Sequence, residues 1–593
     1  MSSKSVALSK TTVQSENAGN TNEDSTSPDF IYGGPFIKVD KPDPFFDTAT
    51  PINLLLQGTF KKSFAYYSLK ERLPIILTKI IDYLSREGSK IKSTHKANDE
   101  DIRGFIQYIT KLKNDLVTNK KYDLLTVDTP EANRWNEWIK ESESPYYFTN
   151  TWVFSECYVY RRLREGCELS KSLQNFDPFD AQKEQALMSS FEPKCVVADK
   201  LVTMLPTGDK EKRKSDFITL LKICLWSNKC DLSLSVGEPV SLSGGNTTKS
   251  QTEVVAPVID PFQMVIDLKD KLLADDSAKV ADQVIAKAEN MAKTIEGPPP
   301  QPSSKKGSPT GSTRGSPVPS PAELEDGVEQ PKVPCPAKMT VPQAAIFDIV
   351  CDNSAYELYT DLCLAHFLVS QKIVQKVRFH VKKIPWFVSD VTPRDFKYLI
   401  QQCKNATYKR EVPSQPNPES AEGADDSPRV VSADNLRAVA QQWQQYVNDG
   451  TFLVQCDDFW TSPHVYKDMK KYDYNVYRKL QFAVAVLFKG DLNYRKLLGE
   501  KNWNPTTGFE TALQGFIPAP VIALRTVKAD LICGLPKGKY EQLTKVDEKW
   551  MQSGDYGLIQ FCPKSEPLKA DEKPCPDYGD SCFGTVCPTH ADL

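Results

Sequence analysis

The feature that most constrains the fold is a change near residue 338, after which short apolar runs alternate with helical patterns. Such alternation is typical of βαβ units, in which helices cover a parallel sheet. The runs predicted to be strands are Ile346–Cys351, Val377–Val381, Phe452–Gln455, Phe482–Phe488, Val521–Arg525 and Gly557–Phe561. We therefore expect an α/β domain over residues 338–562.

The first half of the chain has helical patterns instead. The stretch SLKERLPIILTKIIDYLSRE, which follows Tyr67, spaces its apolar residues as an amphipathic helix does. Further helical patterns cover Asp101–Asn119, the region of Trp135 and Trp138, Trp152–Glu165, Phe217–Trp226 and Pro257–Thr294. No alternating strand pattern occurs before about residue 335. We predict a helical domain over residues 51–240, then a connecting loop and helix over residues 241–295.

Four segments are too polar or too rich in proline to form a core, and we predict that they are disordered. They are the N-terminal tail 1–50, the Pro/Ser-rich insertion 296–337, a second insertion 412–434 and the C-terminal tail 563–593. The first insertion has Ser-Pro pairs at Ser308, Ser316 and Ser320, and a PxxP spacing at Pro299 and Pro302. Such motifs suit contact with a kinase or an adaptor protein, although a plain spacer has the same composition.

The net charge of −3 and the lack of a long apolar stretch limit the partners of the chain. A charge this small argues against binding to nucleic acid or anionic membranes, and no window approaches the roughly 18 apolar residues of a membrane span. The N-terminus has no apolar signal region. We expect no nucleic-acid or membrane partner, and a cytoplasmic location, with the nucleus as a further alternative.

The 15 cysteines fit a reducing compartment. No CxxC pair occurs in the sequence, so a structural zinc site is not expected. We predict buried thiols at Cys157, Cys224, Cys351, Cys363 and Cys533. A further group, Cys575, Cys582, Cys587 and His590, falls in the tail that we expect to be disordered.

Polar side chains follow several of the predicted strands. Asp352 and Asn353 follow the first strand, and Ser389 and Asp390 follow the second. The runs KGDLNYRKL and RTVK come at the ends of two more strands. Because the carboxyl ends of parallel strands meet at one edge of a sheet, these side chains can converge. Asp352-Asn353 alone could be a helix cap, but polar groups at four strand ends favour a binding site.

The side chains in these turns suit the transfer of a phosphoryl group to water. Asp352, Asn353 and Asp390 are hard oxygen donors of the kind that bind Mg²⁺ or Mn²⁺. The predicted donors to phosphate are Lys489, Asn493, Arg495 and Lys528. The motifs of covalent phosphatases, DxDxT or a Cys followed six residues later by Arg, are absent from the sequence. We therefore favour direct attack by a metal-activated water.

Six motifs, taken in order, resemble those of the damage-control phosphatases, formerly known as domain of unknown function 89. They are DNSAYE, PWFVSDVTPRDF, FWTSPH, FKGDLNYRKL, GFIPAP and RTVK. The RTxK form is similar to the subfamily called acidic residue methyltransferase-like. The likeness extends to the first half through FAYYSLKERLPIILTK, ECYVYRRL and WSNKCDLS.

The resemblance implies a helical N-terminal domain packed on a three-layer α/β/α Rossmann-like domain. It implies a divalent metal, Mn²⁺ or else Ni²⁺, Co²⁺ or Mg²⁺, bound by Asp352, Asn353 and Asp390. The implied substrates are sugar phosphates such as fructose 1-phosphate or fructose 6-phosphate, and damaged phosphometabolites. The residues implied to contact them are Asp352, Asn353, Asp491, Leu492, Asn493, Tyr494, Arg495 and Lys528.

Two other classes of function compete with hydrolysis. A relative is credited with S-adenosylmethionine-dependent methylation of protein glutamates, and there Glu357 and Asp390 would contact the cofactor. This chain lacks the Gly-rich turn of a conventional S-adenosylmethionine site after its first strand. The third class is a non-catalytic interaction protein that uses the Pro-rich segments, but such a protein would not need the oxygen donors and cations at the strand ends.

Two details of the motifs bear on the site. Ala355 departs from the family pattern, in which glycine is more usual at this position of DNSAYE. His464 lies in FWTSPH between apolar residues, and we expect it to be packed rather than catalytic. We expect the same of His366 and His380.

Overall fold

The computed structural model describes residues 45–204, 208–227, 260–296, 344–412 and 429–567. The Ser-Pro and PxxP motifs and the Cys575–His590 group lie outside these residues, as do nearly all of both predicted disordered tails and of the first insertion. In the described ranges, no helix combines the length and the apolar character needed to cross a membrane.

A seven-stranded sheet, in the order β1-β9-β8-β7-β2-β3-β6, forms the centre of the second half. All neighbouring strands are parallel except β8 and β9. The strands are β1 (Leu272–Asp275), β2 (Ile346–Val350), β3 (Lys376–His380), β6 (Phe452–Gln455), β7 (Ala483–Lys489), β8 (Val521–Thr526) and β9 (Gly557–Cys562). The six predicted strands are therefore confirmed, each to within one residue at either end.

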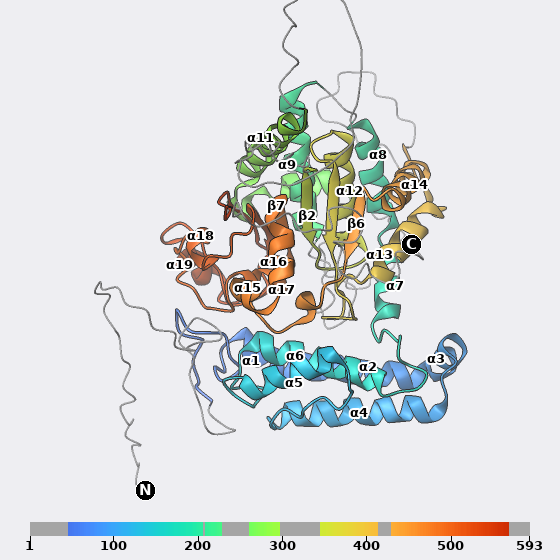
Figure 1. The fold of residues 1–593 in the computed structure, drawn as a ribbon, viewed down its shortest axis with the longest axis vertical. Helices are drawn as coiled ribbons and strands as arrows, with labels where there is room; N and C mark the ends of the chain where they lie inside the picture. Colours follow the sequence, from blue (N-terminus) through green and yellow to red (C-terminus); the bar gives the residue numbers. More distant parts are fainter. Residues whose placement is uncertain (1–44, 205–207, 228–259, 297–343, 413–428, 568–593) are drawn as a thin grey trace, which may run out of the picture.

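Strand residues alternate between two hydrophobic cores, as a pleated sheet requires. On β2, Phe347 and Ile349 face one core and Val350 faces the other. The helices of the first core are α8 (Phe191–Thr203), α9 (Lys210–Ser227), α11 (Ser277–Glu296), α12 (Tyr356–Ser370), α13 (Pro393–Lys404) and α14 (Asp434–Asn448). The second core includes α16 (Tyr474–Gln481) and α17 (Gly490–Leu497). The α/β domain is thus a three-layer sandwich (Figure 1).

The connecting segment differs from its prediction. The continuous helix expected over Pro257–Thr294 is divided into α10 (Pro261–Asp267), a 3₁₀ turn (Lys269–Lys271), the edge strand β1 and α11. A four-residue strand is too short to show a periodicity in the sequence, and β1 is defined by its parallel pairing with β9. Likewise, α8 and α9, which we predicted within the helical domain, cover the sheet instead.

The helical half consists of α1–α6, which Figure 1 shows as a layer across one end of the α/β domain. Its helices are α1 (Phe64–Tyr67), α2 (Leu73–Arg86), α3 (Gly88–His95), α4 (Asp99–Val117), α5 (Pro130–Glu141) and α6 (Trp152–Glu168). A π-helical turn, η1 (Ser68–Arg72), joins α1 to α2. The central helix α6 is buried along almost its whole length, so the amphipathic helices around it pack on a common axis. Helix α7 (Asp180–Met188) then leads toward the sheet.

The second predicted insertion is ordered at both of its ends. Strands β4 (Lys409–Val412) and β5 (Arg429–Ser432) pair antiparallel, and residues 413–428 lie outside the described part of the chain. The pairing satisfies the backbone, and Val431 is buried in the core with α8. The remaining short elements are α15 (Met469–Tyr472), α18 (Phe509–Ala512), α19 (Lys539–Val546) and the 3₁₀ turns η4 (Asp458–Thr461), η5 (Tyr466–Asp468) and η6 (Trp550–Gln552).

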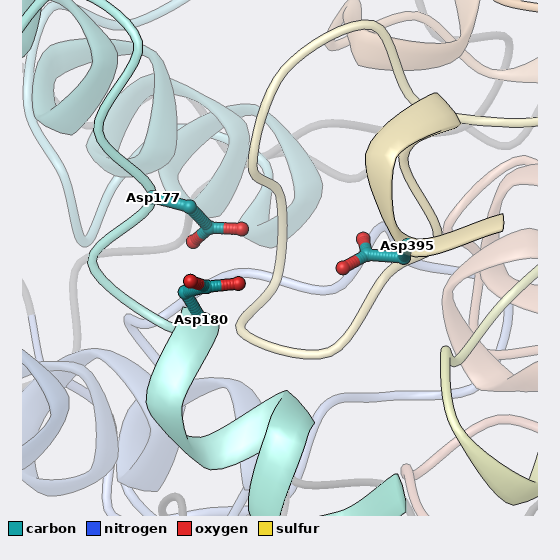
Figure 2. Close-up of side chains that lie close together, drawn as sticks. All are labelled: Asp177, Asp180 and Asp395. Carbon is teal, nitrogen blue, oxygen red and sulfur yellow. The ribbon is translucent and has the colours of Figure 1, made fainter. Parts of the chain in front are cut away.

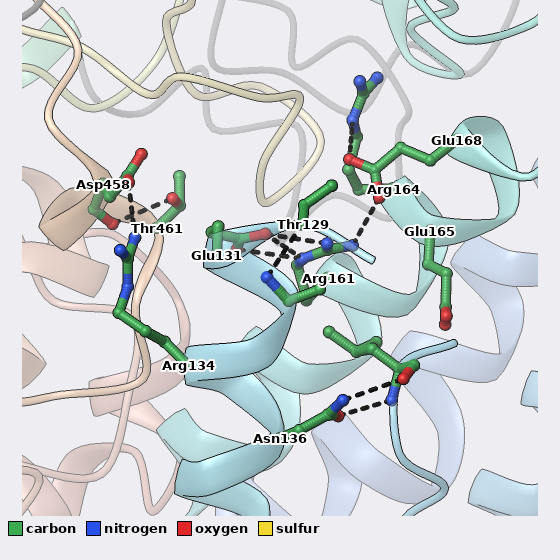
Figure 3. A network of polar contacts seen from close by, with 12 residues as sticks. Thr129, Glu131, Arg134, Asn136, Arg161, Arg164, Glu165, Glu168, Asp458 and Thr461 are labelled. Atoms are coloured by element: carbon green, nitrogen blue, oxygen red, sulfur yellow. Dashed lines mark hydrogen bonds and ion pairs between the residues drawn. The ribbon is translucent and has the colours of Figure 1, made fainter. Parts of the chain in front are cut away.

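Ion pairs join the helical half to the α/β domain. Arg134 on α5 donates to Asp458 on η4 at 2.6 Å, at the edge of a polar network (Figure 3). Within that network the fully buried Arg161 on α6 makes two bonds to Glu131, of 3.0 and 2.9 Å. Because the network links η4 to α5 and α6, the helical half is fastened to the loops at this end of the sheet.

Candidate active site

The turns after β2 and β3 lie side by side. Asn353 and Asp390 form an isolated antiparallel β-bridge. The Val391 amide donates to the Asp352 carbonyl at 2.9 Å, and the Ser354 amide donates to the Ser389 carbonyl at 2.7 Å. Backbone hydrogen bonds therefore bring Asp352, Asn353 and Asp390 together, although the two turns are far apart in the sequence.

These three side chains are buried, with Asp352 4%, Asn353 3% and Asp390 2% exposed. The Asn353 amide nitrogen donates to Asp352 Oδ2 at 3.0 Å and to Glu357 Oε2 at 2.7 Å, while its oxygen accepts from the Ser389 hydroxyl. This arrangement fixes which end of the amide faces each neighbour. Two carboxylates and an amide oxygen held in place away from water are a donor set that fits a hard divalent cation.

The start of α17 closes around the Asp352 carboxylate. A Cβ atom added at Gly490, whose φ is +80°, would lie 1.7 Å from Asp352 Oδ2. Only glycine therefore leaves room for the carboxylate at this point. This requirement explains the glycine of the KGD sequence.

The backbone around the site is strained. Phe387 and Val388, directly before Ser389, have φ values of 44° and 71°. Ala355, the residue before α12, has φ 57° and ψ −120°, a conformation that favours glycine. Such strain persists only where surrounding contacts hold it, and here it lies in the two turns that present the oxygen donors. Nothing in the sequence indicates it at Val388, since β-branched residues rarely adopt positive φ.

Two of the predicted phosphate donors are paired with carboxylates instead. Lys489 Nζ lies 2.8 Å from Glu357 Oε1 and 2.7 Å from Asp361 Oδ1, with all three side chains fully buried. Burial raises the pKa of Asp361 to about 7. Arg495 donates to Glu156 and Glu500, each at 2.6 Å. Lys489 thus ties the end of β7 to α12, and Arg495 ties α17 to α6.

The other residues of the DLNYR run also have framework contacts. The Asn493 amide donates to the Lys489 carbonyl at 2.7 Å and accepts from the Tyr466 hydroxyl. Asp491 accepts from Arg525 at 2.7 Å. Tyr494 donates to Gln560 at 2.7 Å, and Leu492 is buried. Lys528, from RTVK, is 6% exposed. Direct contact of this run with a substrate stays a prediction.

Two lysines close to Asp390 were not singled out from the sequence. Lys382 Nζ lies 3.5 Å from Asp390 Oδ2, and Lys496 Nζ donates to the Ser462 carbonyl at 2.7 Å. Both are 1% exposed. Lys382 comes two residues after β3, so its place beside a strand end could have marked it. Lys496 lies within FKGDLNYRKL, but the direction of its side chain could not be predicted from the sequence.

A second acidic group lies apart from this centre. Figure 2 shows Asp177, Asp180 and Asp395 facing one another, and an oxygen from each lies within 4.8 Å of the others. The Lys183 ammonium bridges Asp177 and Asp395 at 2.9 and 2.8 Å, and Arg394 donates to Asp180 at 2.6 Å. These two cations offset much of the charge of the three carboxylates and tie α7 to α13, so we do not assign a metal to the group.

The histidines and cysteines are packed as predicted. His464 is buried, with its ring stacked on Tyr472 and edge-on to Trp138. His380 is buried beside Asp348, and burial lowers the pKa of His366 to about 4. The described cysteines are free and buried: Cys157, Cys167, Cys195, Cys224, Cys351, Cys363, Cys403, Cys456, Cys533 and Cys562.

The matching family profile and the curated relatives point to one family. The profile of the damage-control phosphatase ARMT1-like domain matches residues 68–295 and 337–543. A protein named damage-control phosphatase ARMT1 from Danio rerio is 32% identical over 517 residues, covering 85% of this chain and 96% of that protein. The Homo sapiens protein of the same name is 33% identical over 518 residues, covering 85% of this chain and 98% of its own. A crystal structure of a DUF89 family protein from Pyrococcus horikoshii covers 78% of this chain and 95% of its own, at 12% identity and a TM-score of 0.32.

Proposed function

The chain belongs to the ARMT1-like family of damage-control phosphatases, and on that premise we propose that it is a metal-dependent phosphomonoesterase of small metabolites. The proposed substrates are damaged phosphometabolites and sugar phosphates of the fructose 1-phosphate or fructose 6-phosphate type. One observation carries the proposal: Asp352, Asn353 and Asp390 are buried together on turns that are hydrogen-bonded to each other.

The three oxygen donors would hold the metal, with Mn²⁺ proposed first and Ni²⁺, Co²⁺ or Mg²⁺ as alternatives. Such an ion polarises a phosphoryl group and lowers the pKa of a bound water. The role of the chain is to keep the donors fixed before substrate arrives. Glu357 and Ser389 orient the Asn353 amide, and Gly490 leaves room for Asp352. In the reaction a water oxygen bonds to phosphorus and the phosphorus–oxygen bond of the ester breaks.

The test is a hydrolysis screen over sugar phosphates, with and without Mn²⁺, on the wild type and on Asp352→Asn and Asp390→Asn. We expect phosphate release that needs the metal and falls by at least about 100-fold in either variant, as when a charged group that stabilises the transition state is lost. Asp82→Asn is the matched control, because Asp82 is an exposed carboxylate on α2 that pairs only with its helix neighbour Arg86 among the described residues. Wild-type activity in both site variants, with the fold retained, would refute the proposed centre.

Methyl transfer from S-adenosylmethionine has less support. Glu357, which would contact that cofactor, already accepts from Lys489 at 2.8 Å and from Asn353 at 2.7 Å. No contact in the described ranges favours a nucleoside site, and the matched family is described by phosphatase activity. We therefore propose hydrolysis alone. A cytoplasmic or nuclear location, and contact with an adaptor or kinase through residues 296–337, stay predictions from the sequence.

A further inference from the structure

The buried lysines near the site differ in how their charge is balanced. Lys183 and Lys489 each lie within 2.9 Å of two carboxylates. Lys382 has a single ion pair among the described residues, to Asp390 at 3.5 Å, which is longer than a hydrogen bond. Lys496 has a carbonyl partner, Ser462, at 2.7 Å and no carboxylate within ion-pair distance in the part of the chain that the structure describes.

Burying two ammonium groups in this way is unfavourable for the folded state unless an anion binds to them. Taking an ammonium out of water is unfavourable, and a neutral carbonyl offsets the cost less than a carboxylate does. Burial is the main cause that lowers the pKa of Lys496 to about 8; the charges of Lys382 and Arg495 act in the same direction, and Cys157 and Asp390 oppose them. The two lysines are thus close enough to repel each other. Lys382 faces Asp390 only at 3.5 Å, and Lys496 is bonded to a neutral carbonyl, so the two ammonium groups have charge to offer to an anionic ligand.

The position of Lys382 and Lys496 beside the proposed metal ligands indicates which class of anion would bind there. Lys382 adjoins Asp390, and its backbone amide is bonded to the Val391 carbonyl at 2.8 Å. Lys496 lies on α17, the helix whose first residue, Gly490, confines Asp352. An anion between these lysines would therefore lie next to the oxygen donors. Phosphate, with two negative charges and several acceptor oxygens, suits two ammonium donors.

We propose that Lys382 and Lys496 bind the phosphoryl group of the substrate and hold it beside Asp352, Asn353 and Asp390. The inference rests on the proposed function and adds to it the residues that recognise phosphate. It replaces Lys489 and Arg495 in the role predicted from the sequence, since those two cations are already paired with carboxylates.

The test measures binding of inorganic phosphate by calorimetry in the presence of Mn²⁺. We compare the wild type with Lys382→Met, Lys496→Met and the charge-conserving Lys382→Arg, and we measure Mn²⁺ binding separately. Each methionine variant should bind phosphate at least about 10-fold more weakly, because one charge-assisted contact is lost, and Lys382→Arg should recover much of the affinity. Mn²⁺ binding should be unchanged or tighter, since no oxygen donor is removed.

Lys383→Met is the matched control. Lys383 is the next residue along the chain, but its side chain is 52% exposed and pairs with Asp458. It should bind phosphate as the wild type does. Unfolding of each variant is monitored as well. Lys496→Met should be at least as stable as the wild type because a buried charge without a carboxylate partner is removed, whereas Lys382→Met leaves the buried Asp390 without this cation and should be less stable.

The outcomes separate this inference from the proposed function. Weak phosphate binding in both methionine variants with normal Mn²⁺ binding supports the inference, even if no phosphate ester is hydrolysed. Wild-type phosphate affinity in both methionine variants would overturn it, even if hydrolysis is found. A wild-type protein that binds no phosphate in the presence of Mn²⁺ would overturn it too.

Discussion

At the scale of single residues, Gly490 shows how tightly the backbone confines Asp352, one of the proposed metal ligands. In Gly490→Ala the new methyl carbon would lie 1.7 Å from Asp352 Oδ2, and the residue would keep a φ of +80°. The carboxylate must therefore move. We expect Mn²⁺ affinity to fall by about 10- to 100-fold or more, as it does when the support of a metal ligand is disturbed, and calorimetry with Mn²⁺ measures it.

Gly508→Ala provides the comparison, because no atom lies within 4 Å of the added carbon and φ is −62°. It should bind Mn²⁺ like the wild type. If Gly490→Ala also binds Mn²⁺ normally, the Asp352 carboxylate is not a ligand of the metal, and the centre must be assigned elsewhere.

How much of the site the sequence predicts depends on the kind of residue. Asp352, Asn353 and Asp390 could be found because each follows a recognisable strand, and parallel strand ends converge. Lys489 and Arg495 looked equally suitable as phosphate donors, since a sequence does not show which cations already have carboxylate partners. The strained Ala355 could be noticed only as a departure from a family pattern, and its φ of 57° gives that departure a physical meaning.

At the scale of elements, strands were easier to predict than the layers around them. Six strands are short, largely apolar runs that are buried almost throughout, and such runs are distinctive in a parallel sheet. The four residues of β1 carry no such signal. Helices α8 and α9 resemble those before them in composition, so only tertiary packing could place them on the sheet.

Glu156 links two elements that come from different halves of the chain. Its carboxylate accepts from Arg72 and Ser68 in the π-helical turn, and from Arg495 on α17 at 2.6 Å. Breaking a buried ion pair leaves an uncompensated charge, which typically costs about 3 kcal/mol or more. We therefore expect Glu156→Gln to lower the free energy of unfolding by about that amount and to weaken activity through displacement of α17. Denaturant titration with a parallel hydrolysis assay measures both.

Glu131→Gln is the appropriate control for this prediction. Glu131 pairs with the buried Arg161, but its own side chain is 25% exposed and it has no contact with α17 among the described residues. It should destabilise the protein less and leave hydrolysis per folded molecule unchanged. If hydrolysis per folded molecule changes equally in Glu156→Gln and Glu131→Gln, Glu156 contributes to stability and does not position α17.

At the scale of the whole molecule, the two halves could be predicted separately but not their arrangement. The change from helical patterns to apolar strands is visible in the sequence, whereas the ion pairs that fasten α5 and α6 to η4 and α17 join residues more than 300 positions apart. Such contacts leave no local pattern. The family motifs in the first half include Ser68, Arg72 and Glu156, so these motifs correspond to the junction between the halves rather than to the chemistry.

The burial of Lys496 should also affect how the stability of the whole molecule depends on pH. The pKa of Lys496 is lowered from 10.5 to about 8, mainly by burial. Below pH 8 the lysine is protonated in both states, so the folded state carries the full cost of burial. Between pH 8 and 10.5 the unfolded chain binds a proton that the folded chain does not, and the cost falls as pH rises. Lys496→Met should therefore be about 3 kcal/mol more stable than the wild type at pH 7, with the difference shrinking by about 1.4 kcal/mol per pH unit above 8.

Lys287→Met is the control that distinguishes the effect of burying a lysine from the effect of binding phosphate. Burial also lowers its pKa to about 8, but it lies on α11 and bonds to the Ala483 carbonyl at 3.2 Å. Denaturant titrations from pH 7 to pH 9 should show that Lys287→Met is also more stable than the wild type. Its gain in free energy of unfolding should be smaller than that of Lys496→Met, because the Lys287 side chain is less buried. Saturating phosphate with Mn²⁺ stabilises the folded wild type by pairing with Lys496. It should thus reduce the advantage of Lys496→Met and leave that of Lys287→Met unchanged. An equal response of the two variants to phosphate would place the anion away from Lys496.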